Sequence, residues 1–75
     1  METEKIFQER LKSLRKEKGV SSRQIAEGIG ITDVGYRNYE AGRRKPTFAV
    51  LPTIADFFNV SIDYLVGRTD NPKMN

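Results

Sequence analysis

Residues 21–40 read SSRQIAEGIGITDVGYRNYE and predict two short helices joined by a tight turn. Gly30 lies between the two helices, and glycine readily adopts the left-handed conformation that ends a helix. Ala26 is a small residue at the position where the second helix must cross the first closely. Thr32 can cap the start of that second helix. The stretch therefore predicts a helix-turn-helix unit, a motif that can place one helix end in the DNA major groove.

The same helix-start signal occurs three times in the chain. Ser21, Thr32 and Ser61 each follow an apolar residue and precede another apolar residue four positions later, which is the pattern of a hydrophobic staple. Gln24 also completes a capping box with Ser21. These signals predict helices over residues 22–28, 33–41 and 62–66.

An earlier helix is expected over residues 5–18. Phe7, Leu11 and Leu14 recur there at helical spacing, and Gly19 follows as a stop signal. Residues 1–4 are expected to form a flexible N-terminus.

The start of the helix between residues 47 and 58 has two alternatives. Thr47 resembles a cap, but Pro52 would then lie inside the helix and remove a hydrogen bond. We therefore favour a helix that starts at Pro52, while a start at Thr47 with a bend at the proline remains the alternative. With the favoured start at Pro52, the side chains expected to face inward are Ile54, Ala55 and Phe58.

Five helices with short connections predict an all-α fold, a compact domain over residues 5–67. Residues 68–75 are polar, contain Pro72 and show no periodicity. They are expected to be a flexible tail or the start of a linker.

Composition excludes several classes of function. The 75 residues include no cysteine and no histidine, which removes disulfides, thiolate or imidazole metal sites and Ser-His or Cys-His nucleophiles. No apolar run approaches the roughly 20 residues that span a bilayer, and the charged start lacks a signal peptide. We expect a cytoplasmic protein that is not an enzyme and has no membrane association, metal or small-molecule cofactor.

A basic run follows the helix-turn-helix unit. Arg43, Arg44 and Lys45 are consecutive, in a chain whose net charge is +3. A local basic patch can hold phosphates, although an ordinary solvated loop is the alternative.

Four segments in order, FQERLKSLRKEKGV, IAEGIGIT, YEAGRRKP and IADFFNVSIDYLVG, resemble one known family. It is the lambda-repressor-like or Xre-type (Cro/CI) DNA-binding domains of phage repressors, Cro proteins and bacterial regulators. The resemblance covers nearly everything from Phe7 to Val66.

The resemblance implies that residues 32–41 form the recognition helix, whose N-terminal residues lie against base edges. It assigns base reading to Asp33, Val34, Arg37 and Asn38. Asn38 would pair with adenine, Arg37 with guanine or a phosphate, Val34 with a thymine methyl and Asp33 with the cytosine amino group. A structural role for Asp33 in the first helical turn is at least as well supported.

Other roles follow from the same resemblance. Tyr36 and Tyr39 are expected in the core, with a phosphate contact as the alternative. Arg15 and Glu40 match a pair that joins the first helix to the end of the third. Ser22 replaces the family's usual glutamine, which puts its bracing of the recognition helix in doubt. The expected phosphate contacts are Ser22, Arg23, Thr32, Arg43, Arg44 and Lys45.

A homodimer that reads a palindromic double-stranded DNA operator is the expected assembly, because one domain makes few base contacts. Related repressors pair through the end of the domain that includes residues 60–66. The expected dimer contacts are Val60, Ile62, Tyr64 and Val66, although exposed apolar residues are common on any surface.

The predicted function is therefore a sequence-specific transcription regulator, most often a repressor in this family. One alternative is an antitoxin-like or regulator-binding interaction module, which would show little salt-dependent affinity for DNA. Another is the DNA-targeting arm of a larger enzyme.

Overall fold

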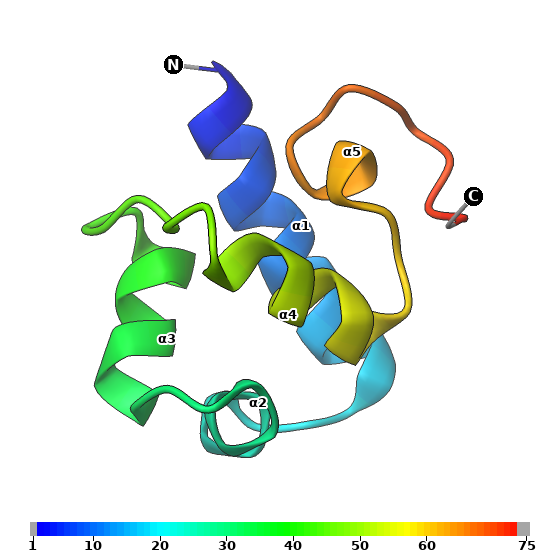
Figure 1. Cartoon of the computed structure of the whole chain (residues 1–75). Helices are drawn as coiled ribbons and strands as arrows, with labels where there is room; N and C mark the ends of the chain where they lie inside the picture. Colours follow the sequence, from blue (N-terminus) through cyan, green and yellow to red (C-terminus); the bar gives the residue numbers. More distant parts are fainter. Residues whose placement is uncertain (1, 74–75) are drawn as a thin grey trace.

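Five α-helices form the regular structure of residues 2–73, the part of the chain that the computed structural model describes (Figure 1). No β-strand occurs in this range, so the predicted all-α class is confirmed. The helices are α1 (Glu2–Lys18), α2 (Ser22–Ile29), α3 (Asp33–Ala41), α4 (Val50–Phe58) and α5 (Ile62–Leu65).

The three predicted caps are present and explain where α2, α3 and α5 begin. Ser21, Thr32 and Ser61 have extended backbones, and each side chain accepts a hydrogen bond from the backbone N–H three residues ahead. The Ser21 N–H also donates to Oε1 of Gln24 at 2.8 Å, which completes the capping box. Local sequence therefore determined these three helix starts.

The favoured start of α4 at Pro52 is wrong. The helix begins at Val50, after the N-cap residue Ala49, whose side chain makes no capping hydrogen bond. Thr47, two residues before Ala49, instead accepts a hydrogen bond from the Val50 N–H on its Oγ1 at 3.2 Å. Pro52 is tolerated in the first turn, where backbone N–H groups have few acceptors within the helix. The observed start thus lies between the two alternatives, and the Thr47 side chain contributes the hydrogen bond that suggested the earlier one.

Helix α1 begins earlier than its predicted start at residue 5. No glycine or proline interrupts residues 2–18, and acidic Glu4 in the first turn is favourable at a helix N-terminus. Met1, the first residue of the expected flexible segment, lies outside the described residues.

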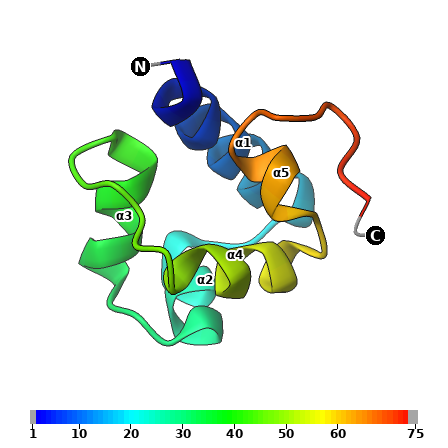
Figure 2. The ribbon, with the colours of Figure 1, turned by 45° about the horizontal axis from the view of Figure 1, so that its top comes forward.

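The core lies where all five helices meet. Its largest fully buried side chains come one from each helix: Leu11 from α1, Ile25 from α2, Tyr36 from α3, Ile54 from α4 and Leu65 from α5. The predicted inward positions of α1 and α4 are also buried. Ala26 is 1% exposed, and α2 and α3 pack closely together around it. This packing fixes α3 on one side of the molecule (Figure 2).

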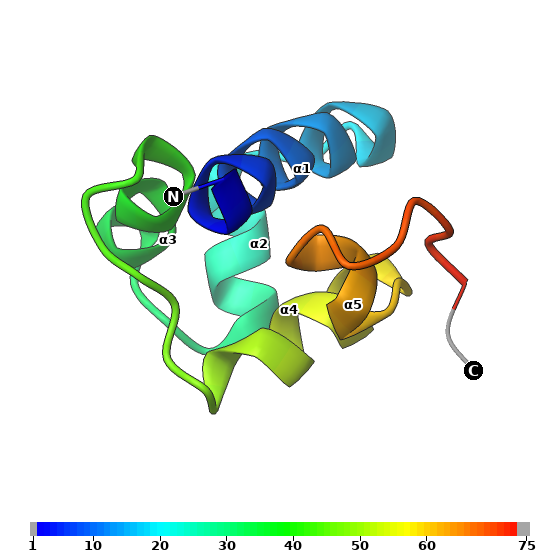
Figure 3. The ribbon, with the colours of Figure 1, turned by 90° about the horizontal axis from the view of Figure 1, so that it is seen from above.

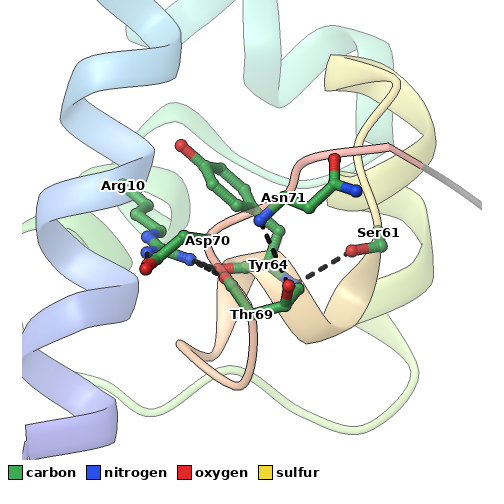
Figure 4. A network of polar contacts seen from close by, with 6 residues as sticks. All are labelled: Arg10, Ser61, Tyr64, Thr69, Asp70 and Asn71. Carbon is green, nitrogen blue, oxygen red and sulfur yellow. Dashed lines mark hydrogen bonds and ion pairs between the residues drawn. The ribbon is translucent and has the colours of Figure 1, made fainter.

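The segment after α5 folds back onto the domain, in contrast to the expected flexible tail. Arg10 of α1 donates to the carbonyl of Thr69 at 2.7 Å, to the carboxylate of Asp70 at 2.8 Å and to the carbonyl of Tyr64 (Figure 4). The Arg10 guanidinium also lies 4.0 Å from the centre of the Tyr64 ring. One arginine on α1 therefore holds the chain after α5 in place.

A backbone contact supports the same path. The Ser61 N–H donates to the Pro72 carbonyl at 2.9 Å, so residues 68–72 return to the start of α5. Figure 3 shows this segment on the side of the molecule away from α3. Residues 74 and 75, the end of the expected tail, lie outside the described residues.

Candidate nucleic-acid interface

Helix α3 has one buried and one exposed face. Tyr36 and Tyr39 are buried, which confirms their predicted place in the core. On the other face Val34 is 61% exposed and the Arg37 side chain is 60% exposed, while Asn38 is half-buried. Because Arg37 and Asn38 lie three and four residues after Val34, both neighbour Val34 on the same side of the helix. This face is available to an external ligand.

Asp33 takes part in a short polar network at the start of α3. Its Oδ1 accepts a hydrogen bond from the Ser22 hydroxyl at 2.8 Å, and its Oδ2 accepts one from Arg37 Nη2 at 3.0 Å. Ser22 therefore does brace the start of α3 through this hydrogen bond, a role that the sequence had left in doubt. A hydroxyl has one proton to donate, so Ser22 does not offer it to a phosphate while it is bound to Asp33.

Two other predicted phosphate ligands flank this network. Arg23 is exposed on the first turn of α2, one residue after Ser22. Thr32 is exposed and accepts the Gly35 N–H at 3.0 Å, which leaves its hydroxyl proton free for another acceptor. Thr32 directly precedes α3, and Arg23 directly follows Ser22, whose hydroxyl contacts Asp33 of α3.

The predicted basic run lies in the connection between α3 and α4. Gly42 ends α3 in the left-handed conformation, with φ of 79°, and Arg43, Arg44 and Lys45 follow as exposed residues. The ammonium of Lys45 lies 3.5 Å from a carboxylate oxygen of Glu4 on α1. Because this pair is exposed to water, it contributes little and can exchange for a phosphate.

Arg15 and Glu40 form the predicted ion pair between α1 and α3. Arg15 Nε lies 2.9 Å from Oε2 and Nη2 lies 3.0 Å from Oε1, a two-point contact with a buried carboxylate. Burial alone would raise the pKa of Glu40, but the hydrogen bonds and charge of Arg15 outweigh it, and the pKa lies below its usual value. The hydrogen bond to Glu40 likewise raises the pKa of Arg15. The pair therefore remains charged and joins α3 to α1.

Tyr36 lies next to this pair. Burial, followed by the nearby Glu40 carboxylate, raises the pKa of its phenol. The hydroxyl is buried and makes no well-formed hydrogen bond to the described residues, even though the charge of Glu40 acts on it. The phenol thus stays neutral inside the core and does not face a phosphate.

The four residues predicted to make the dimer contact differ in their exposure to solvent. Val60 is 4% exposed, so its assignment to the dimer surface is wrong: the chain enters α5 with this side chain in the core. Tyr64 and Val66 are half-buried, and Arg10 covers one face of the Tyr64 ring. Ile62 is 39% exposed and remains the accessible apolar residue of the set.

Two features of this region were not predicted. Phe48, three residues after Lys45, is 92% exposed. The sequence feature that could have indicated this exposure is an aromatic residue in the turn-rich segment GRRKPTF. The Asp33–Arg37 ion pair was also missed, although opposite charges four residues apart on a predicted helix could have indicated it. Its bond to Ser22 needed the relative placement of α2 and α3.

Within residues 2–73 no group of three or more acidic side chains is placed to hold a metal ion. None of the helices there combines the length and apolar character needed to span a membrane.

Comparison with known proteins agrees with this geometry. The helix-turn-helix family HTH_3 matches residues 11–65. The HTH-type transcriptional regulator YobD of Bacillus subtilis is 40% identical over 67 residues, which are 89% of this chain and 60% of YobD. The cryptic phage CTXphi repressor RstR of Vibrio cholerae is 43% identical over 62 residues, 83% of this chain and 55% of RstR.

A solved structure shows the same architecture. The crystal structure of a transcriptional regulator from Listeria innocua matches with a TM-score of 0.75 and 39% identity, over 81% of this chain and 57% of that one. The chain spans about 60% of the length of the first relatives that it matches. The relatives are transcriptional regulators, and the predicted resemblance is confirmed: the chain belongs to the helix-turn-helix family HTH_3, of the Xre or Cro/CI type.

Proposed function

We propose that this chain binds double-stranded DNA as a sequence-specific transcription regulator, with α3 in the major groove. One observation carries the proposal: α3 buries Tyr36 and Tyr39 while it exposes Val34 and Arg37 on its other face. A helix held in this way can present side chains to base edges without disturbing the core.

The proposed base-reading side chains are Val34, Arg37 and Asn38. Asn38 is suited to a two-point contact with adenine, Arg37 to guanine and Val34 to a thymine methyl. Asp33 was also predicted to read a base, but both of its carboxylate oxygens already accept hydrogen bonds within the protein.

The proposed phosphate contacts surround this face. They come from Arg23, Thr32, Arg43, Arg44 and Lys45, all of which are exposed. Ser22 leaves this set because its hydroxyl donates to Asp33. With about four cationic contacts in each subunit, a dimer would release enough counterions for a log–log salt slope near −7.

We further propose that two copies read a palindromic operator whose half-sites lie about 34 Å apart. Of the four residues predicted to make the dimer contact, Ile62 is exposed, and Tyr64 and Val66, which follow it closely in sequence, are half-buried. The pairing surface is therefore proposed around α5 without Val60. Sedimentation of wild type and Ile62→Asp, with and without operator, tests this pairing, and an unchanged dimer in the variant would reject it.

Selection from a random DNA pool, followed by titration at several salt concentrations, tests the DNA-binding proposal. An enriched inverted repeat and a steep salt dependence are expected. Asn38→Ala should relax the preference at one base position in each half-site, whereas Arg44→Ala should weaken binding to all sequences alike. A flat salt dependence together with a co-purifying protein would instead support the interaction module.

A further inference from the structure

The polar network of Ser22, Asp33 and Arg37 crosses from α2 to the exposed face of α3. We propose that Asp33 is a positioning residue that holds Arg37 ready to read a guanine, and that Asp33 itself reads no base. This inference rests on the proposed function, because it assigns roles within the same DNA-reading face.

The contacts of Asp33 come from two different helices. Ser22 on α2 donates to Oδ1 at 2.8 Å, and Arg37, one turn further along α3, donates to Oδ2 at 3.0 Å. The bond from α2 limits rotation of the carboxylate independently of α3. The carboxylate can then hold the guanidinium in one orientation, which reduces the conformational freedom lost on binding DNA.

The guanidinium keeps enough donors for a base. Arginine has five N–H donors, and the bond to Asp33 is made through Nη2. The remaining edge can donate to O6 and N7 of guanine, the two acceptors of that base in the major groove. The Arg37 side chain is 60% exposed and that of Asp33 is 33% exposed, so arginine is the more accessible partner.

Electrostatics favours the same division of roles. A bare carboxylate close to the phosphate backbone would be repelled, whereas the Asp33–Arg37 pair has no net charge. Direct reading of a cytosine amino group by Asp33 is the competing role, since a carboxylate has further lone pairs. Positioning of Arg37 and direct reading of a base by Asp33 predict different changes in base preference for the variant Asp33→Asn.

The test measures wild type and four variants against the selected DNA site and all its single-base changes. Arg37→Met should remove a guanine preference of about 5- to 150-fold at one position in each half-site. Asp33→Asn should reduce that same preference by up to about tenfold, which lies within the range of coupling between residues in contact. Its affinity for unrelated DNA should stay constant or rise, because a negative charge has been removed.

Two further variants keep the result interpretable. Ser22→Ala should change the same base position in the same direction, by a smaller factor, since one support of the carboxylate remains. Asp56→Asn makes the same charge change at an exposed site on α4 and should leave the base preference intact. Circular dichroism spectra and melting curves verify that each variant is folded.

The inference is overturned if Asp33→Asn alters a position other than the one read by Arg37. It is also overturned if the guanine preference is unchanged in Asp33→Asn or survives in Arg37→Met. In each of these cases the wild type still selects a site, so the proposed function stands. If wild type shows no sequence-selective, salt-dependent binding to DNA, the proposed function fails and the inference fails with it.

Discussion

Removing either member of the Arg15–Glu40 pair should give unequal losses of stability. The Glu40 side chain is 11% exposed and that of Arg15 is 29% exposed. Arg15→Met therefore leaves a buried carboxylate without its counter-ion, and we expect a loss of about 3 kcal/mol in the free energy of unfolding. Glu40→Gln leaves an arginine that can turn toward water, and the expected loss is about 1 to 2 kcal/mol.

The acid dependence of stability provides the second part of this prediction. In wild type the pKa of Glu40 lies below its ordinary value of 4.5, so the carboxylate stabilises the fold above that pH and the contribution is lost as pH falls through the lowered pKa. In Arg15→Met the main opposition to the effect of burial is lost, so the pKa of Glu40 rises relative to wild type. The penalty in that variant is then relieved on acidification, and the stability difference from wild type should narrow below neutral pH.

Urea and thermal unfolding followed by circular dichroism measure these quantities. A loss of 3 kcal/mol in a domain of this size corresponds to a fall in Tm of about 12 to 24 °C. Exposed Lys16→Met on the same helix is the matched control and should stay within about 0.5 kcal/mol of wild type. Equal, small losses in Arg15→Met and Glu40→Gln, with no change in their pH dependence, would refute the reasoning.

Three further predictions concern single contacts. Arg10→Met should release residues 68–73, which hydrogen exchange would detect as faster exchange in this segment; unchanged exchange would contradict the role given to Arg10. Gly28→Ala should destabilise the domain despite the higher helix propensity of alanine, because the new Cβ would lie 2.4 Å from Cε1 of Phe57. Adding Phe57→Leu should recover stability, measured by thermal unfolding as for the other variants. Thr47→Ala should lower the free energy of unfolding by about 1 kcal/mol, because it removes the hydrogen bond that the Val50 N–H donates to Thr47 Oγ1. A loss below about 0.3 kcal/mol would argue against a stabilising role of this bond.

The elements predicted best are those specified by neighbouring residues. Ser21 and Thr32 cap their helices with backbone groups three positions away, so a short window of sequence contains the whole interaction. The predicted range 33–41 for α3 agrees with the structure, and the predicted ranges of α2 and α5 differ from it by one residue each. The sequence also indicated Thr47 as a possible cap, but the rule against proline inside a helix favoured Pro52 and placed the start of α4 two residues too late.

The sequence alone determined the helix-turn-helix unit, the all-α class and the family, because helix periodicity, caps and motif order are properties of residues close together along the chain. Tertiary structure decided the use of Ser22, the burial of Val60 and the return of residues 68–73 onto α1. Arg10 meets Thr69 across 59 positions, and no local pattern encodes which distant carbonyl an arginine will reach. Such contacts follow from helix packing, which is settled only when the whole core is assembled.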